Sequence, residues 1–137
     1  MIVGTEWLIE AAGCDKAALR DEARVRAILD RVIADLGLRS VGSVWHKFEG
    51  EGGVTGLIAL TESHLACHTY PEHATATFNL YCCRTRPEWE WDVKLRSSLG
   101  ADHVVVTRIE RGGHRDNFPN LKLEISDLRS ASVGGEQ

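Results

Sequence analysis

Most of the side chains that could do chemistry lie in one stretch of the chain, residues 56–83. The stretch contains Ser63 between a glutamate and a histidine, a further histidine at His68, and two adjacent cysteines at its end. Such side chains supply the nucleophiles, general acids and bases, and metal ligands of enzymes. Each of them alone has an ordinary structural explanation, since a serine beside a turn usually serves the turn. A functional prediction therefore has to rest on the pattern that they form together.

A zinc site is one alternative, because the stretch offers six side chains of suitable type. They are His64, Cys67, His68, His73, Cys82 and Cys83. Their spacing argues against it, since His64 and His68 stand about 13 Å apart on an extended chain. The sequence has no Cys-x-x-Cys pair and no His-Glu-x-x-His motif. A serine hydrolase is also disfavoured, because Ser63 does not lie in a Gly-x-Ser-x-Gly motif.

The elements that must position these residues follow from the hydrophobic periodicity. Apolar runs and alternation predict strands at residues 3–12, 41–48, 54–61, 65–70, 74–83, 104–109 and 121–125. Helical spacing covers residues 15–36, followed by Gly37 as a C-cap, and residues 87–99, with Pro87 as the first helical residue. This order predicts an α+β fold, a two-layer sandwich with an antiparallel β-sheet and two main helices on one face.

The strand at residues 74–83 has the clearest alternation in the chain. Its apolar side ends with Cys82, which is expected in the core. Its other side carries polar residues and ends with Cys83. A cysteine is most often a small buried hydrophobe, but this pattern places Cys83 among the polar side chains and favours a functional role. The polar residues of that side are Thr75, Thr77, Asn79 and Tyr81.

Length and composition indicate one globular domain, expected at residues 1–128, with a disordered tail at residues 129–137. The net charge is −4 and no basic block is present, so nucleic acid is not an expected partner. The longest apolar run has four residues, too few to span a membrane. The N-terminus lacks the features of a signal peptide. We therefore expect a cytoplasmic protein whose four cysteines are free thiols.

The chemistry-bearing stretch resembles the prokaryotic S-adenosylmethionine decarboxylase proenzymes. The resemblance lies in Glu62-Ser63-His64-Leu65, in His68-Thr69 and Pro71-Glu72, and in Cys83 at the end of the next strand. It extends to His46-Lys47-Phe48, to Gly53-Val54-Thr55-Gly56 and to Ile109-Glu110-Arg111-Gly112. It covers most of residues 3–112, and the combination is much more specific than any isolated triplet.

The resemblance implies that the proenzyme cuts itself between Glu62 and Ser63, giving a β chain of residues 1–62 and an α chain of residues 63–137. Ser63 would attack the Glu62 carbonyl, and elimination and hydrolysis would leave a pyruvoyl group at residue 63. By resemblance, His68 would remove the α-proton in the elimination. The hydroxyl of Thr55, where the family has serine, would hydrogen-bond the Glu62 carbonyl as the oxyanion forms.

For turnover, the resemblance implies a substrate Schiff base at the pyruvoyl group of residue 63, without pyridoxal phosphate and without a required metal. Cys83 would return a proton to the substrate α-carbon. Glu72 matches the carboxylate that suits the ribose hydroxyls, and Phe48 matches an aromatic that stacks on adenine. Tyr70 stands at a further substrate-binding position. The β and α chains would stay together and pair as a homodimer that makes decarboxylated S-adenosylmethionine for spermidine synthesis.

Several departures from the family pattern fall near the expected pocket. Tyr70 replaces the usual tryptophan, and His73-Ala74-Thr75 replaces a more typical Tyr-Gly-Tyr stretch. One alternative is therefore a pyruvoyl-dependent decarboxylase of ornithine, arginine or another basic amino acid. A second alternative is an unprocessed relative that has no enzymatic activity or that binds a metal. The residues of self-cleavage are intact, so the departures bear on the substrate rather than on processing.

Overall fold

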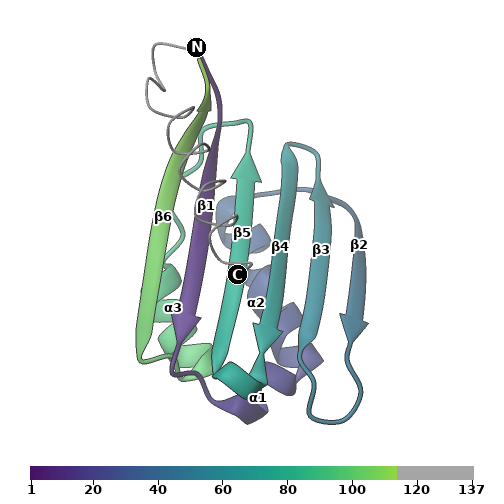
Figure 1. The fold of residues 1–137 in the computed structure, drawn as a ribbon. Coiled ribbons are helices and arrows are strands. Elements are labelled where there is room, and N and C mark those ends of the chain that lie inside the picture. The colour runs from purple at the N-terminus through teal and green to yellow at the C-terminus, as the bar shows by residue number, and fades with distance from the viewer. Residues whose placement is uncertain (114–137) are drawn as a thin grey trace, which may run out of the picture.

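The computed structural model describes residues 1–113, whose strands form one six-stranded antiparallel sheet (Figure 1). The strands are β1 (Ile2–Ala12), β2 (Ser40–Lys47), β3 (Val54–Leu60), β4 (Ser63–Tyr70), β5 (Thr75–Cys82) and β6 (His103–Gly112). They lie in the order β2-β3-β4-β5-β1-β6, so the first strand is inserted between two strands of the second half of the chain. The predicted strand at residues 121–125 and the predicted tail lie outside the described residues.

The helices form the second layer and lie behind the sheet in Figure 1. They are α1 (Lys16–Arg20), α2 (Glu22–Leu36) and α3 (Trp91–Leu99), and a 3-10 turn, η1 (Pro71–His73), joins β4 to β5. The predicted α+β sandwich, an antiparallel sheet with two main helices on one face, is confirmed. Within residues 1–113, no helix is both long enough and apolar enough to cross a bilayer.

The predicted helix at residues 15–36 is divided into α1 and α2 at Asp21. The Asp15 carboxylate accepts a hydrogen bond from the Ala17 amide at the start of α1. The Asp21 carboxylate accepts one from the Arg24 amide at the start of α2, so each helix has its own N-cap. The predicted C-cap is confirmed, because Gly37 ends α2 in the left-handed conformation with φ 63°.

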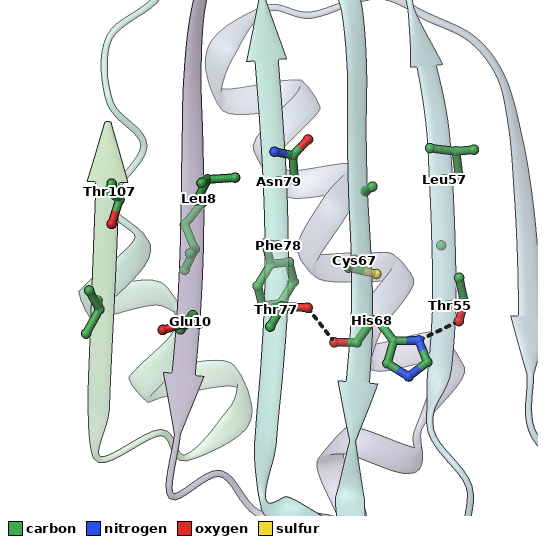
Figure 2. Close-up of a pocket in the computed structure, with 14 residues that line it drawn as sticks. Leu8, Glu10, Thr55, Leu57, Cys67, His68, Thr77, Phe78, Asn79 and Thr107 are labelled. Atoms are coloured by element: carbon green, nitrogen blue, oxygen red, sulfur yellow. Dashed lines mark hydrogen bonds between the residues drawn. The ribbon is translucent and has the colours of Figure 1, made fainter. Parts of the chain in front are cut away.

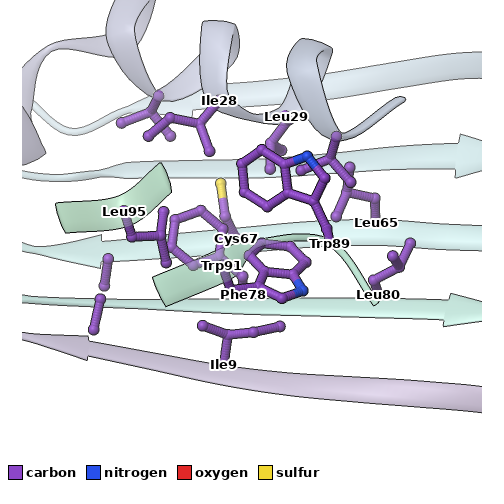
Figure 3. Packing of buried hydrophobic residues seen from close by; sticks show 14 of the residues in the cluster. Ile9, Ile28, Leu29, Leu65, Cys67, Phe78, Leu80, Trp89, Trp91 and Leu95 are labelled. Atoms are coloured by element: carbon purple, nitrogen blue, oxygen red, sulfur yellow. The ribbon is translucent and has the colours of Figure 1, made fainter. Parts of the chain in front are cut away.

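The predicted start of the last helix at Pro87 is wrong, because α3 begins at Trp91. The residues before it are not helical. Among them, Trp89 donates its indole N–H to Asp35 of α2 at 2.9 Å. Trp89 and Trp91 are both buried and meet edge to face (Figure 3). Packing of these two large side chains outweighs the local preference for a helix that starts at proline.

The core lies between the sheet and the helices, where alternate strand residues meet the apolar faces of α2 and α3. Figure 3 shows Ile9, Leu65, Phe78 and Leu80 from the sheet together with Ile28, Leu29 and Leu95 from the helices. Full burial of a side chain of this kind contributes about 1.5–3 kcal/mol. Within residues 1–113, the sheet is thus held against a single layer of helices on one of its faces.

We call the face of the sheet that points away from the helices the open face, since no other element among residues 1–113 covers it. The side chains there alternate with the buried ones and stay half-buried or exposed. They include Glu6 and Leu8 of β1, Thr55 and Leu57 of β3, His64, His68 and Tyr70 of β4, Thr77, Asn79 and Tyr81 of β5, and Val105 of β6. The open face therefore combines polar, titratable and exposed apolar groups.

Candidate active site

Strand β4 carries the predicted nucleophile and the predicted processing base at different places along its length. Ser63 is the first residue of the strand, whereas His68 lies five residues further on, next to its end. Five residues of extended chain span about 16 Å. One copy of the chain therefore does not bring Ser63 and His68 together. We call the two regions the Ser63 end and the His68 end of the open face.

At the Ser63 end, the backbone before the serine is held in a constrained conformation. Ser63 has a backbone φ of 144°, a value that residues other than glycine rarely adopt. The preceding residue, Glu62, is 4% exposed. Arg86 donates two hydrogen bonds to its carboxylate, at 2.7 and 3.2 Å. The hydrogen bonds to Glu62 raise the pKa of the Arg86 guanidinium further above its ordinary value, so this guanidinium stays charged.

The carbonyl that Ser63 would attack already has a hydrogen-bond donor. The Glu62 carbonyl oxygen accepts from the backbone N–H of Cys83 at 3.0 Å. An N–H in this position stabilises negative charge that develops on the oxygen. The Cys83 side chain is exposed and follows directly after β5, whereas Cys82 is buried, as the alternation predicts. The structure thus brings Glu62, Ser63 and Cys83 together.

A chain of hydrogen bonds leads away from Ser63 across four strands, β4, β5, β1 and β6. The Ser63 hydroxyl lies 2.9 Å from His64 Nδ1, and His64 Nε2 lies 3.0 Å from Asn79 Oδ1. Asn79 Nδ2 donates to the Glu6 carboxylate, which also accepts from Arg111 at 3.2 Å. The side chains of His64, Asn79, Glu6 and Arg111 project from the open face, where Arg111 also lies over the Tyr81 ring.

No role in cleavage or turnover was expected from the sequence for His64, Asn79 or Glu6. Alternation in β5 places Asn79 on the polar side of the strand, which is a partial signal. Its contact with Glu6 depends on the pairing of β1 with β5, and these residues are 73 positions apart in the chain. A long-range strand pairing of this kind leaves no local signature.

At the His68 end, the imidazole is surrounded by the other predicted site residues. The Thr55 hydroxyl lies 2.6 Å from His68 Nδ1, across the paired strands β3 and β4 (Figure 2). The rings of Tyr70 and Phe48 meet the imidazole edge to face, with centroids 4.3 and 5.8 Å from it. The Thr55 hydroxyl was expected to hydrogen-bond the Glu62 carbonyl, but within one chain it contacts His68 instead.

Glu72 lies just beyond this group, in the 3-10 turn η1. Its carboxylate is largely exposed and stands 4.0 Å from the His73 imidazole. Phe48 is also exposed, so the His68 end presents aromatic rings and the exposed Glu72 carboxylate toward solvent. Flat rings can stack on a nucleobase and a carboxylate can accept hydrogen bonds from sugar hydroxyls.

A hollow of about 630 Å³ runs along the open face from His68 toward Asn79. Figure 2 shows Thr55 and His68 near one end of it and Asn79 further along β5. Leu8, Leu57 and Val105 give it an apolar lining. Among residues 1–113, no three His, Cys, Asp or Glu side chains are grouped so that they could hold a metal ion. The hollow therefore offers an apolar surface that ends in polar groups.

Known proteins share both the sequence pattern and the fold of this chain. The family profile described as S-adenosylmethionine decarboxylase matches residues 5–112. The S-adenosylmethionine decarboxylase proenzyme of Prochlorococcus marinus (strain MIT 9313) is 36% identical, over 80% of this chain and 88% of that protein. The proenzyme of the same name from Thermococcus onnurineus (strain NA1) is 32% identical over 98% and 97% of the two chains.

A solved structure shares the fold. The crystal structure of the adenosylmethionine decarboxylase from Aquifex aeolicus superposes with a TM-score of 0.67 at 24% identity. It covers 82% of this chain and 93% of that one. At this level of identity the structural similarity shows only that the fold is shared. The family is shown by the sequence matches. This chain belongs to the S-adenosylmethionine decarboxylase family.

Proposed function

We propose that the chain cuts its own backbone between Glu62 and Ser63 and then decarboxylates S-adenosylmethionine at the pyruvoyl group so formed. The observation that supports this most is the backbone geometry at the peptide bond between Glu62 and Ser63. The serine has the rare φ of 144°, and the carbonyl before it is held by the Cys83 amide. Backbone strain of this kind costs about 1–3 kcal/mol and is relieved when the bond is cut.

Cleavage begins when Ser63 Oγ attacks the Glu62 carbonyl carbon. The Cys83 N–H stabilises the charge on the carbonyl oxygen, and collapse breaks the C–N bond and leaves an ester between Glu62 and Ser63. Removal of the Ser63 α-proton then expels the Glu62 carboxylate and leaves dehydroalanine. Water converts dehydroalanine to a pyruvoyl group and releases ammonia. The residues around Ser63 therefore fit the formation of this group.

The base for the α-proton is His68, and it comes from a second copy of the chain. Within one chain, His68 lies about 16 Å along the strand from Ser63. Two copies whose open faces stack with their β4 strands antiparallel place the Ser63 end of one over the His68 end of the other. The exposed Leu8, Leu57 and Val105 on this face support such a contact, since exposed apolar patches mark interaction surfaces. Thr55 then orients His68 through its hydroxyl.

In turnover, a pyruvoyl group supplies an electron-poor carbonyl that accepts the electrons released as carbon dioxide leaves. Cys83 returns a proton to the substrate α-carbon from its exposed position beside residue 63. Glu72 accepts hydrogen bonds from the ribose hydroxyls, and Phe48 and Tyr70 stack on the adenine. These three residues share the His68 end, so the nucleoside and the reacting carbon are held by different copies.

The proposed enzyme has no need of pyridoxal phosphate or a metal ion, and its product supplies aminopropyl groups for spermidine synthesis. We place it in the cytoplasm, where a reducing environment keeps its four cysteines as the free thiols that the structure contains. Residues 1–128 form one domain in this proposal, and the β chain of residues 1–62 stays bound to the α chain of residues 63–137.

Intact mass of the purified protein tests the proposal. We expect two fragments, residues 1–62 and 63–137, with the second lighter by one ammonia than a chain that begins with serine. Ser63→Ala should stay whole. Release of labelled carbon dioxide is then measured with S-adenosylmethionine, arginine and ornithine. An uncut wild-type chain refutes self-cleavage, while a cut chain that acts on arginine or ornithine instead refutes the substrate.

A further inference from the structure

His64 lies beside the reacting serine but has no role in the mechanism proposed above. Its Nδ1 lies 2.9 Å from Ser63 Oγ, which is the atom that must lose a proton before or during attack. Whether this contact helps depends on which ring nitrogen carries hydrogen. If Nδ1 carried it, the imidazole would donate to the serine and could not take its proton.

The neighbouring side chains decide this question. A carboxylate only accepts hydrogen bonds, so the Asn79 group that faces Glu6 must be its NH₂, which is Nδ2. The other end of the amide, Oδ1, therefore faces His64, and an amide oxygen only accepts. His64 Nε2 must donate to it. In the neutral imidazole this leaves Nδ1 without a hydrogen, with its lone pair toward the Ser63 hydroxyl.

We propose that His64 is the general base for the first step of self-cleavage and that Asn79 is the residue that positions it. This inference rests on the proposed cleavage at Ser63. His64 Nδ1 takes the hydroxyl proton as the Oγ–C bond to Glu62 forms. It returns the proton to the departing Ser63 nitrogen as the C–N bond breaks, which converts amide to ester without a net change in protons.

The two histidines of β4 then have separate steps. His64 touches the reacting oxygen and acts before the ester exists. His68 lies at the other end of the strand, with its Nδ1 against Thr55, and acts on the α-proton after the ester has formed. A variant of each histidine should therefore stop the chain at a different chemical species.

The test uses hydroxylamine, which cuts an ester and leaves an ordinary peptide bond intact. The variants are His64→Asn and His68→Ala, each made in the full-length chain. Asparagine places a neutral oxygen close to the position of Nδ1, so it can accept a hydrogen bond but is not a useful base. His103→Asn is the matched control, because His103 is exposed at the start of β6, on the far edge strand.

We expect His64→Asn to slow cleavage by at least about 100-fold, within the range that general bases contribute, and to resist hydroxylamine. His68→Ala should also stay whole in buffer but be cut by hydroxylamine at residue 63. His103→Asn should be cut at the wild-type rate. Circular dichroism and thermal melting show whether His64→Asn is folded.

A second variant keeps the inference testable if His64→Asn is misfolded. Asn79→Leu keeps the size of the side chain but removes the hydrogen bond to His64 Nε2 and the one by which Asn79 is itself held to Glu6. We expect slower cleavage and no hydroxylamine-sensitive ester in a chain whose circular dichroism spectrum and melting temperature match those of Ser63→Ala, and this match excludes general destabilisation as the cause. Cleavage of His64→Asn at the wild-type rate, or accumulation of its ester, overturns the inference while self-cleavage stands. An uncut wild-type chain overturns self-cleavage, and the inference with it.

Discussion

Cys82 and Cys83 are adjacent in the sequence and lie in very different surroundings. Cys82 is buried under the sheet, and desolvation, followed by the nearby Glu62 charge, raises the pKa of its thiol to about 12. Burial likewise raises the pKa of Cys67 to about 12 and that of Cys14 above its usual value. Cys83 is exposed. Only a thiolate is a strong nucleophile, so these thiols differ in reactivity.

We predict that iodoacetamide near pH 8 modifies Cys83 well before the other three cysteines of the chain, because they are buried and stay protonated. Peptide mass mapping identifies the alkylated residue. Decarboxylase activity should fall in step with modification of Cys83, whereas the uptake of label by Cys83→Ala should be slow. Early labelling of Cys82 would contradict the burial described above.

The same raised pKa values predict a loss of stability in alkali. In the unfolded chain the Cys67 and Cys82 thiols ionise near pH 9, while in the folded chain they stay protonated to about pH 12. The folded state then binds more protons, so the free energy of unfolding falls as pH rises through this window. Urea unfolding of Ser63→Ala at several pH values measures this decline in the free energy of unfolding. In that background, Cys82→Ala should show a shallower decline, and an equal decline would count against this account.

At the scale of the elements, Arg86 joins the loop after β5 to two other parts of the fold. It holds the Glu62 carboxylate in the turn before β4 and donates to the Leu36 carbonyl at the end of α2. The turn that contains the proposed cleavage site is therefore tied to both layers. Glu62 is buried, and among the described residues Arg86 is the one cationic side chain that pairs with its carboxylate.

We predict that Arg86→Leu lowers the melting temperature by several degrees and slows self-cleavage, because it leaves a buried carboxylate without a partner. The melting temperature is measured in the Ser63→Ala background, so that only uncut chains are compared. Adding Glu62→Leu should restore much of the loss, since an apolar pair of similar size removes the buried charge. Arg84→Leu is the matched control, because Arg84 is exposed in the same loop. If Arg86→Leu melts like this control, the ion pair does not hold the turn.

The elements also show which features a single sequence can predict. Alternation in residues 74–83 predicts β5 and the opposite surroundings of Cys82 and Asn79, because the period of a strand is a local property. The start of α3 could not be predicted, since it depends on the contact between Trp89 and Asp35, 54 positions away. The Ser63 and Cys83 neighbourhood was predicted, but only by resemblance to a family. The separation of Ser63 from His68 along β4 follows from the structure.

At the scale of the whole molecule, the two ends of the open face predict complementation between inactive chains. When Ser63→Ala and His68→Ala are co-expressed with different tags, a mixed dimer has Ser63 from one chain facing His68 from the other. We expect the His68→Ala chain to be cut in the mixture, which detection of its tagged fragment shows. Co-expression with the double variant Ser63→Ala/His68→Ala should give no cutting. If the mixture also stays uncut, the two residues do not meet across a dimer.

The strand order has a further consequence once the chain is cut. Strands β1, β2 and β3 belong to residues 1–62, and β4, β5 and β6 belong to residues 63–137. In the sheet, β1 lies between β5 and β6, so each product holds strands of the other on both sides. Separation of the products requires the sheet to come apart, which makes unfolding of the mature protein a dissociation. Its melting temperature should therefore rise with protein concentration. In uncut Ser63→Ala the two parts stay covalently joined, so separation of the products adds no concentration dependence to its melting temperature. Folding is a one-chain event only before the cut, and the mature enzyme, once unfolded, can recover only by a collision of two different chains.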